Sequence, residues 1–266
     1  MLNENKKAVI FGGSGAIGGA VAQALIREGV EIYLVARNQK KLEKFAKELC
    51  AMGGIVETFC IDVLDEKSII EQVAQLAQKS GGIDIVVNAT GFMHDQGKLI
   101  SELSLTEFLQ GITPFLTAQF NISKAVEPYM GRERSGVIIS IVAPSSSMAI
   151  PGHLGHIVGC AGVEAFNKAL ASELGGKNIR VICVRSHAIA DAIQAGSYTR
   201  ELFETKALAM GLTVQQWLDG VAQSTMLQRL PTLLDVAEIV AFLASDHASV
   251  ITATVINMTA GGTPDR

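Results

Sequence analysis

Short apolar runs alternate along this chain with longer stretches in which apolar residues recur every three or four positions. The short runs predict seven strands, at residues 8–11, 31–36, 55–61, 83–88, 136–142, 179–185 and 254–258. The longer stretches predict six helices between them, at residues 16–28, 39–52, 66–79, 105–130, 153–174 and 235–244. Asp235 is expected to cap the last helix.

This alternation predicts an α/β fold built as a three-layer, doubly wound sandwich. Parallel strands need helical crossovers, and strands that are apolar on both faces must be covered on both sides. We therefore expect a parallel sheet of about seven strands with helices on both faces, in a single domain over residues 1–266. The segment 191–229 breaks the rhythm with scattered aromatic and Met residues, and we expect it to form a helical lid over the carboxyl edge of the sheet.

Composition excludes several classes of partner. The net charge is −4 and the pI is about 5.8, so the chain has no basic stripe for nucleic acid or for an anionic membrane surface. The first residues lack the apolar stretch of a signal peptide, and no apolar run is long enough to span a bilayer, so we expect a cytoplasmic protein. The four cysteines show no CxxC spacing and are expected to be buried thiols.

A glycine-rich turn follows the first expected strand. The turn reads Gly-Gly-Ser-Gly-Ala-Ile-Gly over residues 12–18 and leads into an expected helix. Glycines there allow a tight turn, and they let a pyrophosphate approach the free amides at the positive end of the helix. An ordinary strand-to-helix turn is the alternative. The candidate cofactor-binding residues in this turn are Gly12, Ser14, Gly15, Ile17 and Gly18.

Motifs along the rest of the chain extend this pattern. The turn matches the spacing TGxxxGxG, with Phe11 in place of the Thr and Ala16 in place of the middle Gly. Four later segments also match motifs of the proteins that share this spacing. They are the pair 62–63, the turn 88–91 and the segments 229–246 and 251–262. Over about residues 6–262 the chain therefore resembles the short-chain dehydrogenase/reductase family.

The resemblance implies a Rossmann-like fold that binds a nicotinamide dinucleotide. It implies that the adenine is bordered by Asp62 and Val63, and that the ribose is lined by Asn88, Ala89 and Gly91. NAD-preferring members carry an acid at the position of Ala36, whereas this chain has Arg37 next to it. A guanidinium can pair with a 2′-phosphate, so we expect NADP(H) to be favoured over NAD(H). A solvated arginine at a strand end is the alternative.

The reactive end departs from the family. There the resemblance implies a Tyr that exchanges a proton with substrate, a Lys that lowers the pKa of this Tyr, a Ser that holds the substrate oxygen, and an Asn in a proton relay. The corresponding positions of this chain hold His156, Cys160, Ala143 and Phe115. Ser145 lies just beyond Ala143 and could supply a hydroxyl after a small loop shift. Standard carbonyl or alcohol hydride transfer is therefore not expected by the usual route.

Two further side chains are expected near the same end. Among the three tyrosines, only Tyr198, in the lid, is placed to approach the cleft. Asp191 is expected to bring a carboxylate near the phosphates or carboxamide of the cofactor.

Histidines gather where the family residues are missing. His94, His153, His156 and His187 are all expected to border one cleft, with His153, His156 and Cys160 along one helical face. Three interpretations stay open: an acid/base site centred on His156 with help from His153, His187 or Ser145; a metal site with Cys160; or pocket-lining residues without chemistry. No metal ligand is assigned, because no specific metal spacing is present.

These observations leave two hypotheses for function. The first is an NADP(H)-binding member of the family without ordinary hydride transfer. The second is an active NADP(H)-dependent oxidoreductase or lyase that uses His156 as acid/base on a small carbonyl or hydroxyl compound. Both imply a small-molecule ligand. The family resemblance further implies a homotetramer or homodimer that forms through the segments 105–130 and 153–174, where small residues such as Ala161 and Ala165 permit close packing.

Overall fold

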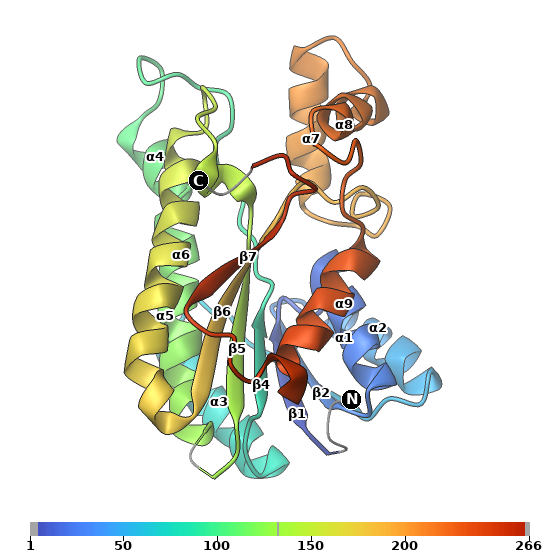
Figure 1. The fold of residues 1–266 in the computed structure, drawn as a ribbon, viewed down its shortest axis with the longest axis vertical. Coiled ribbons are helices and arrows are strands. Elements are labelled where there is room, and N and C mark those ends of the chain that lie inside the picture. Colours follow the sequence, from blue (N-terminus) through green and yellow to red (C-terminus); the bar gives the residue numbers. More distant parts are fainter. Residues whose placement is uncertain (1–4, 132, 264–266) are drawn as a thin grey trace.

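The computed structural model describes residues 5–131 and 133–263, and its centre is one parallel sheet (Figure 1). The strand order is β3-β2-β1-β4-β5-β6-β7. The strands are β1 (Lys7–Phe11), β2 (Glu31–Ala36), β3 (Val56–Cys60), β4 (Ile85–Asn88), β5 (Gly136–Val142), β6 (Ile179–Ser186) and β7 (Thr254–Met258). All the pairings are parallel, so every strand ends at the same edge of the sheet. The predicted fold class is confirmed, and the predicted strands agree to within two residues.

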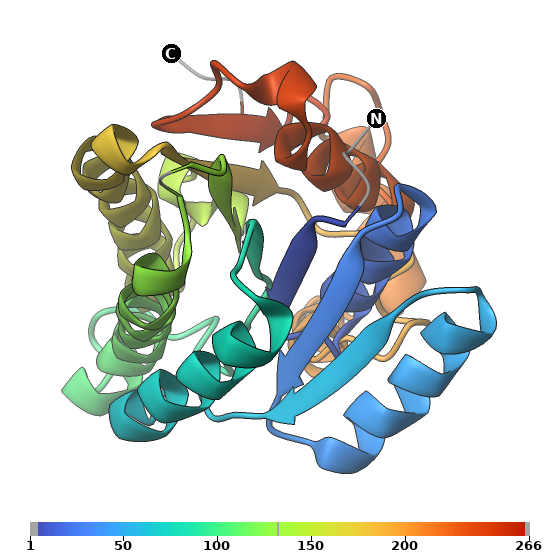
Figure 2. The ribbon, with the colours of Figure 1, turned by 90° about the horizontal axis from the view of Figure 1, so that it is seen from below.

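Helices cover both faces of the sheet, as the uniformly apolar strands require (Figure 2). One face carries α1 (Ala16–Arg27), α2 (Gln39–Ala51) and α9 (Leu233–Ala244). The other carries α3 (Glu66–Ser80), α5 (Thr113–Val126) and α6 (Leu154–Leu174). Alternate side chains of β1 enter the two cores: Ala8 and Ile10 face one, and Val9 and Phe11 face the other.

The long helix predicted over 105–130 is wrong, because the structure breaks it into α4 (Leu105–Gln110), α5 and a 3₁₀ turn (Glu127–Tyr129). Pro114 stands in the first turn of α5 and has no N–H to continue the helix ladder of α4. Gly111, at the break, lies directly against the backbone of α6. A Cβ on Gly111 would be 2.5 Å from the carbonyl carbon of Gly155. The break therefore lets α4 and α6 approach closely beside the cleft.

The cap of the last helix also differs from the prediction. Thr232, and not Asp235, is the N-cap of α9, and its hydroxyl accepts from the Asp235 amide at 3.2 Å. The Asp235 carboxylate reaches back to the Thr232 amide at 2.8 Å. The two residues form a capping box, in which an acid at the third helical position supports the cap instead of being it.

The lid region is helical, as predicted. It contains α7 (Thr199–Ala209) and α8 (Val214–Gln223), which stand beyond the carboxyl end of the sheet (Figure 1). The rings of Phe203 and Trp217 lie 4.8 Å apart and join the two helices. Ile193, Leu218 and Leu230 are buried in the same small core. The lid therefore has packing of its own, separate from the two main cores.

The cysteines divide into two pairs. Cys160 and Cys183 are buried as expected, but Cys50 and Cys60 are exposed, which contradicts the prediction for those two. They lie at the end of α2 and at the end of β3, an edge strand. None of the helices in the described part of the chain is long and apolar enough to cross a membrane.

Candidate functional site

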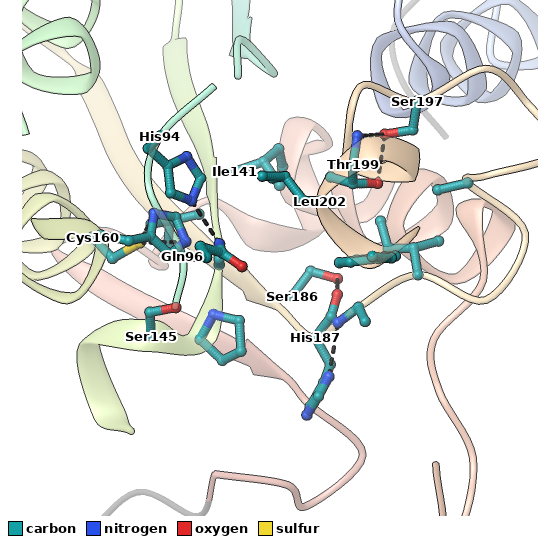
Figure 3. A pocket seen from close by; sticks show the side chains of 18 of the residues that line it. His94, Gln96, Ile141, Ser145, Cys160, Ser186, His187, Ser197, Thr199 and Leu202 are labelled. Atoms are coloured by element: carbon teal, nitrogen blue, oxygen red, sulfur yellow. Dashed lines mark hydrogen bonds between the residues drawn. The ribbon is translucent and has the colours of Figure 1, made fainter. Parts of the chain in front are cut away.

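A cavity of about 340 Å³ lies at the carboxyl end of the sheet, between the ends of the central strands and the lid (Figure 3). Its walls are mostly apolar, with a few polar side chains. This is the place where parallel α/β sheets bind ligands, because loops and helix N-termini converge there. The four residues that the family resemblance assigns to the catalytic positions all line it, namely Phe115, Ala143, His156 and Cys160.

The glycine-rich turn has the shape that a pyrophosphate needs. Gly12 has a φ of +80°, and a Cβ there would lie 2.5 Å from the Ala89 carbonyl oxygen. A Cβ on Gly18 would lie 2.4 Å from the Gly12 oxygen. The N-cap of α1 is Gly15, which gives no side-chain hydrogen bond, so the first amides of the helix remain available to an anion. The residues present therefore fit a dinucleotide phosphate.

The other candidate cofactor residues follow the same edge, because β3, β2, β1 and β4 are neighbours that end together. Arg37 is exposed immediately after β2. Asp62 is exposed after β3, and the Val63 carbonyl accepts from the Asn121 side chain at 2.9 Å. Ile17, Asn88 and Ala89 line the cavity, and Ser14 lies within the turn itself.

Gly91, which the resemblance places along the ribose, is covered by a side chain of the lid. The ring of Tyr198 covers it: a Cβ on Gly91 would lie 2.2 Å from a ring carbon of Tyr198 and 2.6 Å from the phenol oxygen. The lid tyrosine thus reaches the cleft, as predicted. Tyr198 is 43% exposed, and its partial desolvation raises the pKa of the phenol, so the group stays protonated at neutral pH. A ligand that contacts Gly91 must share this space with the ring.

Aromatic rings occupy the two positions at which the resemblance implies an Asn and a Tyr. The rings of His94 and His156 stack at 4.0 Å with an interplanar angle of 14°. Phe115 meets His94 and His156 edge-on or tilted, at 5.7 and 5.8 Å, and meets Phe92 at 5.2 Å. Phe92, His94, Phe115 and His156 thus form one packed cluster of rings in the cavity wall.

His156 and Cys160 are neighbours that stay neutral. The Cys160 Sγ lies 3.6 Å from His156 Nε2. Burial, and then the nearby His94, lowers the pKa of His156 to about 3. Burial, and then Glu164, raises the pKa of Cys160 to about 12. The two groups therefore do not form a thiolate–imidazolium pair. At neutral pH neither group is charged, and neither has a pKa near 7 that would suit proton exchange.

The other three histidines border the same cavity, and burial lowers the pKa of each. His94 Nδ1 lies 2.8 Å from the Phe92 carbonyl, to which it donates, so its Nε2 accepts from Gln96 at 2.6 Å. His153 Nδ1 donates in the same way to the Pro151 carbonyl at 2.9 Å. His187 Nδ1 accepts from the Ala188 amide at 2.8 Å. The predicted gathering of histidines is thus observed.

These histidines do not converge as metal ligands. His94 and His156 meet face to face. Within residues 5–131 and 133–263, no three His, Cys, Asp or Glu side chains are grouped so that they could hold an ion. The arrangement gives the metal interpretation no geometric support.

Two neighbouring predictions have different outcomes. Ser145 lines the cavity and is buried in a 3₁₀ turn (Pro144–Ser147), close to Cys160. Asp191 does not face the cofactor site, because its carboxylate accepts from the Leu233 amide at 2.8 Å at the start of α9. The carboxylate there offsets the positive end of a helix and does not repel a phosphate.

Several cavity residues were not singled out from the sequence, and two of them, Lys206 and Gln96, carry polar groups that matter below. Lys206, on α7, lines the cavity with its Nζ 5.6 Å from the centre of the Trp217 ring, and burial lowers the pKa of Lys206 to about 8. Gln96 lines it from the loop after β4. The only available signal for Lys206 was its spacing of four from Leu202, which also lines the cavity and therefore shares its helical face.

The neutral state of His156 makes a prediction about stability. Its pKa in the unfolded chain is near the ordinary 6.5, against about 3 in the fold. As the pH falls below 6.5, His156 therefore takes up a proton in the unfolded chain but not in the fold, and the free energy of unfolding decreases. From pH 7.5 to pH 5, the free energy of unfolding of the native chain should fall by about 2 kcal/mol more than that of His156→Phe. Urea unfolding at both pH values measures this. Equal losses would show that His156 titrates normally in the fold.

Comparison with known proteins identifies the family. A family model described as enoyl-(acyl carrier protein) reductase matches residues 13–263. The chain belongs to the short-chain dehydrogenase/reductase family. The 3-oxoacyl-(acyl-carrier-protein) reductase of Chlamydia muridarum is 31% identical over 258 residues, 97% of each chain. Nodulation protein G of Rhizobium meliloti is 30% identical over 260 residues, 96% of each chain. The family consists of NAD(P)-dependent oxidoreductases that bind small molecules and are typically oligomeric.

Solved structures show the same fold. An NAD⁺-bound xylitol dehydrogenase has a TM-score of 0.86 at 21% identity, covering 97% of this chain and 99% of that one. An actinorhodin polyketide ketoreductase with NADPH has a TM-score of 0.83 at 23% identity, covering 100% of both chains. One of these structures contains NAD⁺ and the other NADPH, so the shared fold does not discriminate between the two cofactors.

Proposed function

We propose that this member of the family binds NADP(H) together with a small molecule but lacks the standard carbonyl or alcohol hydride transfer. The observation that carries the proposal is the neutral, packed pair at the reactive end. By the family resemblance, His156 and Cys160 take the places of the Tyr and the Lys. The pKa of His156 is about 3 and that of Cys160 is about 12. A phenol activated by a neighbouring cation is what proton exchange with a carbonyl oxygen requires, and this pair offers neither part.

The glycine-rich turn and Arg37 support the binding of NADP(H). The glycine cradle leaves room for a pyrophosphate, and Gly15 leaves the amides of α1 uncapped. A bound NADP(H) would supply or accept a hydride at its nicotinamide. The chain itself would hold the phosphates on backbone amides and the 2′-phosphate on Arg37, which is exposed at the end of β2.

The second candidate function is an oxidoreductase or lyase that uses His156 as acid/base. The position of His156 in the cavity wall favours it. The low pKa of His156 weighs against it, because an imidazole that stays neutral at pH 7 has no proton to give beyond its N–H. A screen of carbonyls and alcohols with NADPH and NADP⁺, run on the native chain and on His156→Ala, separates the two candidates.

Arg37 carries the cofactor preference. Arg37→Ala should raise the Kd for NADPH about 10- to 100-fold and leave that for NADH nearly unchanged, because a charge-assisted pair with the 2′-phosphate is lost. Fluorescence titration of both nucleotides measures this. Lys47→Ala, an exposed change farther along α2, is the control and should bind both as the native chain does. An equal loss for both nucleotides would show that Arg37 does not contact the phosphate.

For assembly we propose a homotetramer or homodimer through α5 and α6. Phe120 on α5 and Val158 on α6 are 48% and 41% exposed, beside the exposed small residues Ala161 and Ala165. Apolar and small side chains on adjoining helices suit close packing with a second copy. Light scattering of the purified chain measures its mass, and a monomer at micromolar concentration would contradict this proposal.

A further inference from the structure

Three polar side chains of the cavity come from different elements and form what we call its polar corner. This polar corner consists of Lys206 on the lid, Gln96 on the loop after β4, and His153 at the start of α6. The two loops that carry Gln96 and His153 are tied by a backbone hydrogen bond from the Gly97 amide to the Gly152 oxygen, at 2.7 Å. Lys206 is close enough to the loops for its charge to lower the pKa of His153. Three separate elements thus meet at one place.

Two buried atoms of the polar corner lack partners. Among the described residues, Gln96 Oε1 and His153 Nε2 are the buried side-chain atoms without a hydrogen bond. Gln96 gives its amide N–H to His94, which turns its oxygen away from that ring (Figure 3). His153 gives its Nδ1 proton to Pro151, which leaves Nε2 as an acceptor. Each unmet acceptor in a buried site costs free energy until a donor reaches it, so both favour a ligand that carries a hydroxyl.

The charge of Lys206 is also unmatched. The residues that line the cavity include no Asp, Glu or Arg, and the lining histidines have lowered pKa values. No carboxylate pairs with Lys206 among the ion pairs of the described chain, and burial alone accounts for its lowered pKa. Asp95, on the neighbouring loop, accepts from the Lys98 amide at 3.3 Å and does not line the cavity. Apart from its contact with the Trp217 ring, the half-buried ammonium has no counter-ion, so a ligand that carries a negative charge would stabilise it.

Apolar side chains line much of the rest of the cavity, between scattered polar residues such as Ser197 and Thr199. Met148 and Ile150 line the cavity on one side, and Leu202 and Phe203 on the side of the lid. A single cation suits one negative charge, whereas a dianionic phosphate needs several donors to leave water. The chemistry of the polar corner therefore matches a monocarboxylate with a hydroxyl group and a hydrocarbon chain.

We propose that the cleft binds a hydroxy acid, with its carboxylate on Lys206, its hydroxyl donating to Gln96 or His153, and its chain along the apolar wall. This assignment deepens the proposed function, since it names the small molecule of the same cleft, and it rests on that cleft being a binding site. Lys206 thereby selects the acid over its neutral derivatives, and the two orphaned acceptors select a hydroxyl over a bare hydrocarbon.

The chain contains a built-in reporter for this proposal. Trp217 is its single tryptophan, it lines the cavity, and Lys206 lies over its ring. An anion that draws the ammonium away from the ring should change the emission of Trp217. The probes are 3-hydroxyoctanoate and methyl 3-hydroxyoctanoate, which share the hydroxyl and the alkyl chain and differ in charge. Titrations are run at pH 7 without nucleotide, where Lys206 is protonated.

The acid is expected to change Trp217 fluorescence saturably and to bind about tenfold or more tightly than the ester, as is usual when a charge-assisted hydrogen bond is present. Lys206→Met keeps the apolar stem and should reduce the affinity of the acid to that of the ester. Isothermal titration calorimetry of Lys206→Met provides a reading that does not depend on the lysine lying over Trp217. Lys47→Met, on exposed α2, is the matched control and should behave as the native chain.

Gln96→Glu gives a second, independent variant. It adds a negative charge to the polar corner that holds Lys206, and it should weaken the acid while leaving the ester nearly unchanged, because only the acid is repelled and only the acid depends on the ammonium. Equal affinities of the acid and the ester, unchanged binding of the acid to Lys206→Met, or no saturable response to the acid at millimolar concentration would each overturn the proposal. These readings need no nucleotide, so failure to bind NADPH would contradict the proposed function and leave this result intact.

Discussion

Restoring the family residues at the reactive end is expected to raise carbonyl-dependent oxidation of NADPH at least about 100-fold above the native chain. General acid catalysis contributes on the order of 10²- to 10⁴-fold when a group with the right pKa is in place. The four positions all line one cavity, so we expect the new side chains to face one another across it. The variant carries the changes Phe115→Asn, Ala143→Ser, His156→Tyr and Cys160→Lys.

The expected rise in activity depends on the residues at positions 156 and 160. Residues four apart on a helix face the same way, so a lysine at 160 can lower the pKa of a tyrosine at 156. The native pair cannot do this, because both groups are neutral in their buried positions. NADPH absorbance with a panel of ketones and aldehydes measures the gain. The matched control keeps the other three changes but carries His156→Phe, and should stay at the native level. If the variant with all four changes folds and binds NADPH but oxidises it no faster than the native chain, these replacements are not what removes the reaction.

Gly15→Asp is expected to weaken NADPH binding by about 100-fold or more with little change in stability. Gly15 is the exposed N-cap of α1, with φ −89° and ψ 168°, a conformation that any residue adopts. Asp is a preferred N-cap and complements the positive end of the helix, which offsets the crowding of its Cβ against the Gly12 oxygen, so the stability of the fold should change little. The same carboxylate occupies the amides that the pyrophosphate needs and repels its charge.

The control for this change is Gly15→Asn, which has nearly the same shape and capping ability but no charge. A Cβ at this position meets only the Gly12 oxygen, at 3.2 Å, so both variants crowd the turn equally. We expect Asn to weaken NADPH binding much less than Asp. Fluorescence titration and urea unfolding, run on both variants, give the two readings. Native affinity in Gly15→Asp would show that no phosphate sits on α1.

The strands and most helices could be predicted because their signal is local. Strands such as Val9–Phe11 in β1 are apolar on both faces, and only a sheet covered on both sides buries them in that way. The break before α5 was missed because the apolar spacing continues through it, although Pro114 is a local signal for a new helix. The close approach of Gly111 to α6 at this break is a tertiary contact, which periodicity does not show. Likewise, Thr232 and Asp235 are both capping residues, and the choice between them depends on where the backbone turns.

The site was predictable only in part, for a similar reason. His94, His153, His156 and His187 follow strands or open a helix at the carboxyl edge, and that edge is where they meet. Lys206 sits on a lid helix, and whether its side chain faces the cleft or the solvent depends on how α7 packs on α8. Asp191 was misplaced because the sequence does not show that the start of α9 lies beside it.

The most direct test of the proposed function is carbonyl-dependent oxidation of NADPH by the native chain, measured at a nucleotide concentration that titration shows to be saturating, alongside His156→Ala. We predict saturable binding of NADPH by both proteins and no carbonyl-dependent turnover by either. Turnover by the native chain that disappears in His156→Ala would contradict this and establish His156 as the acid/base of an active oxidoreductase.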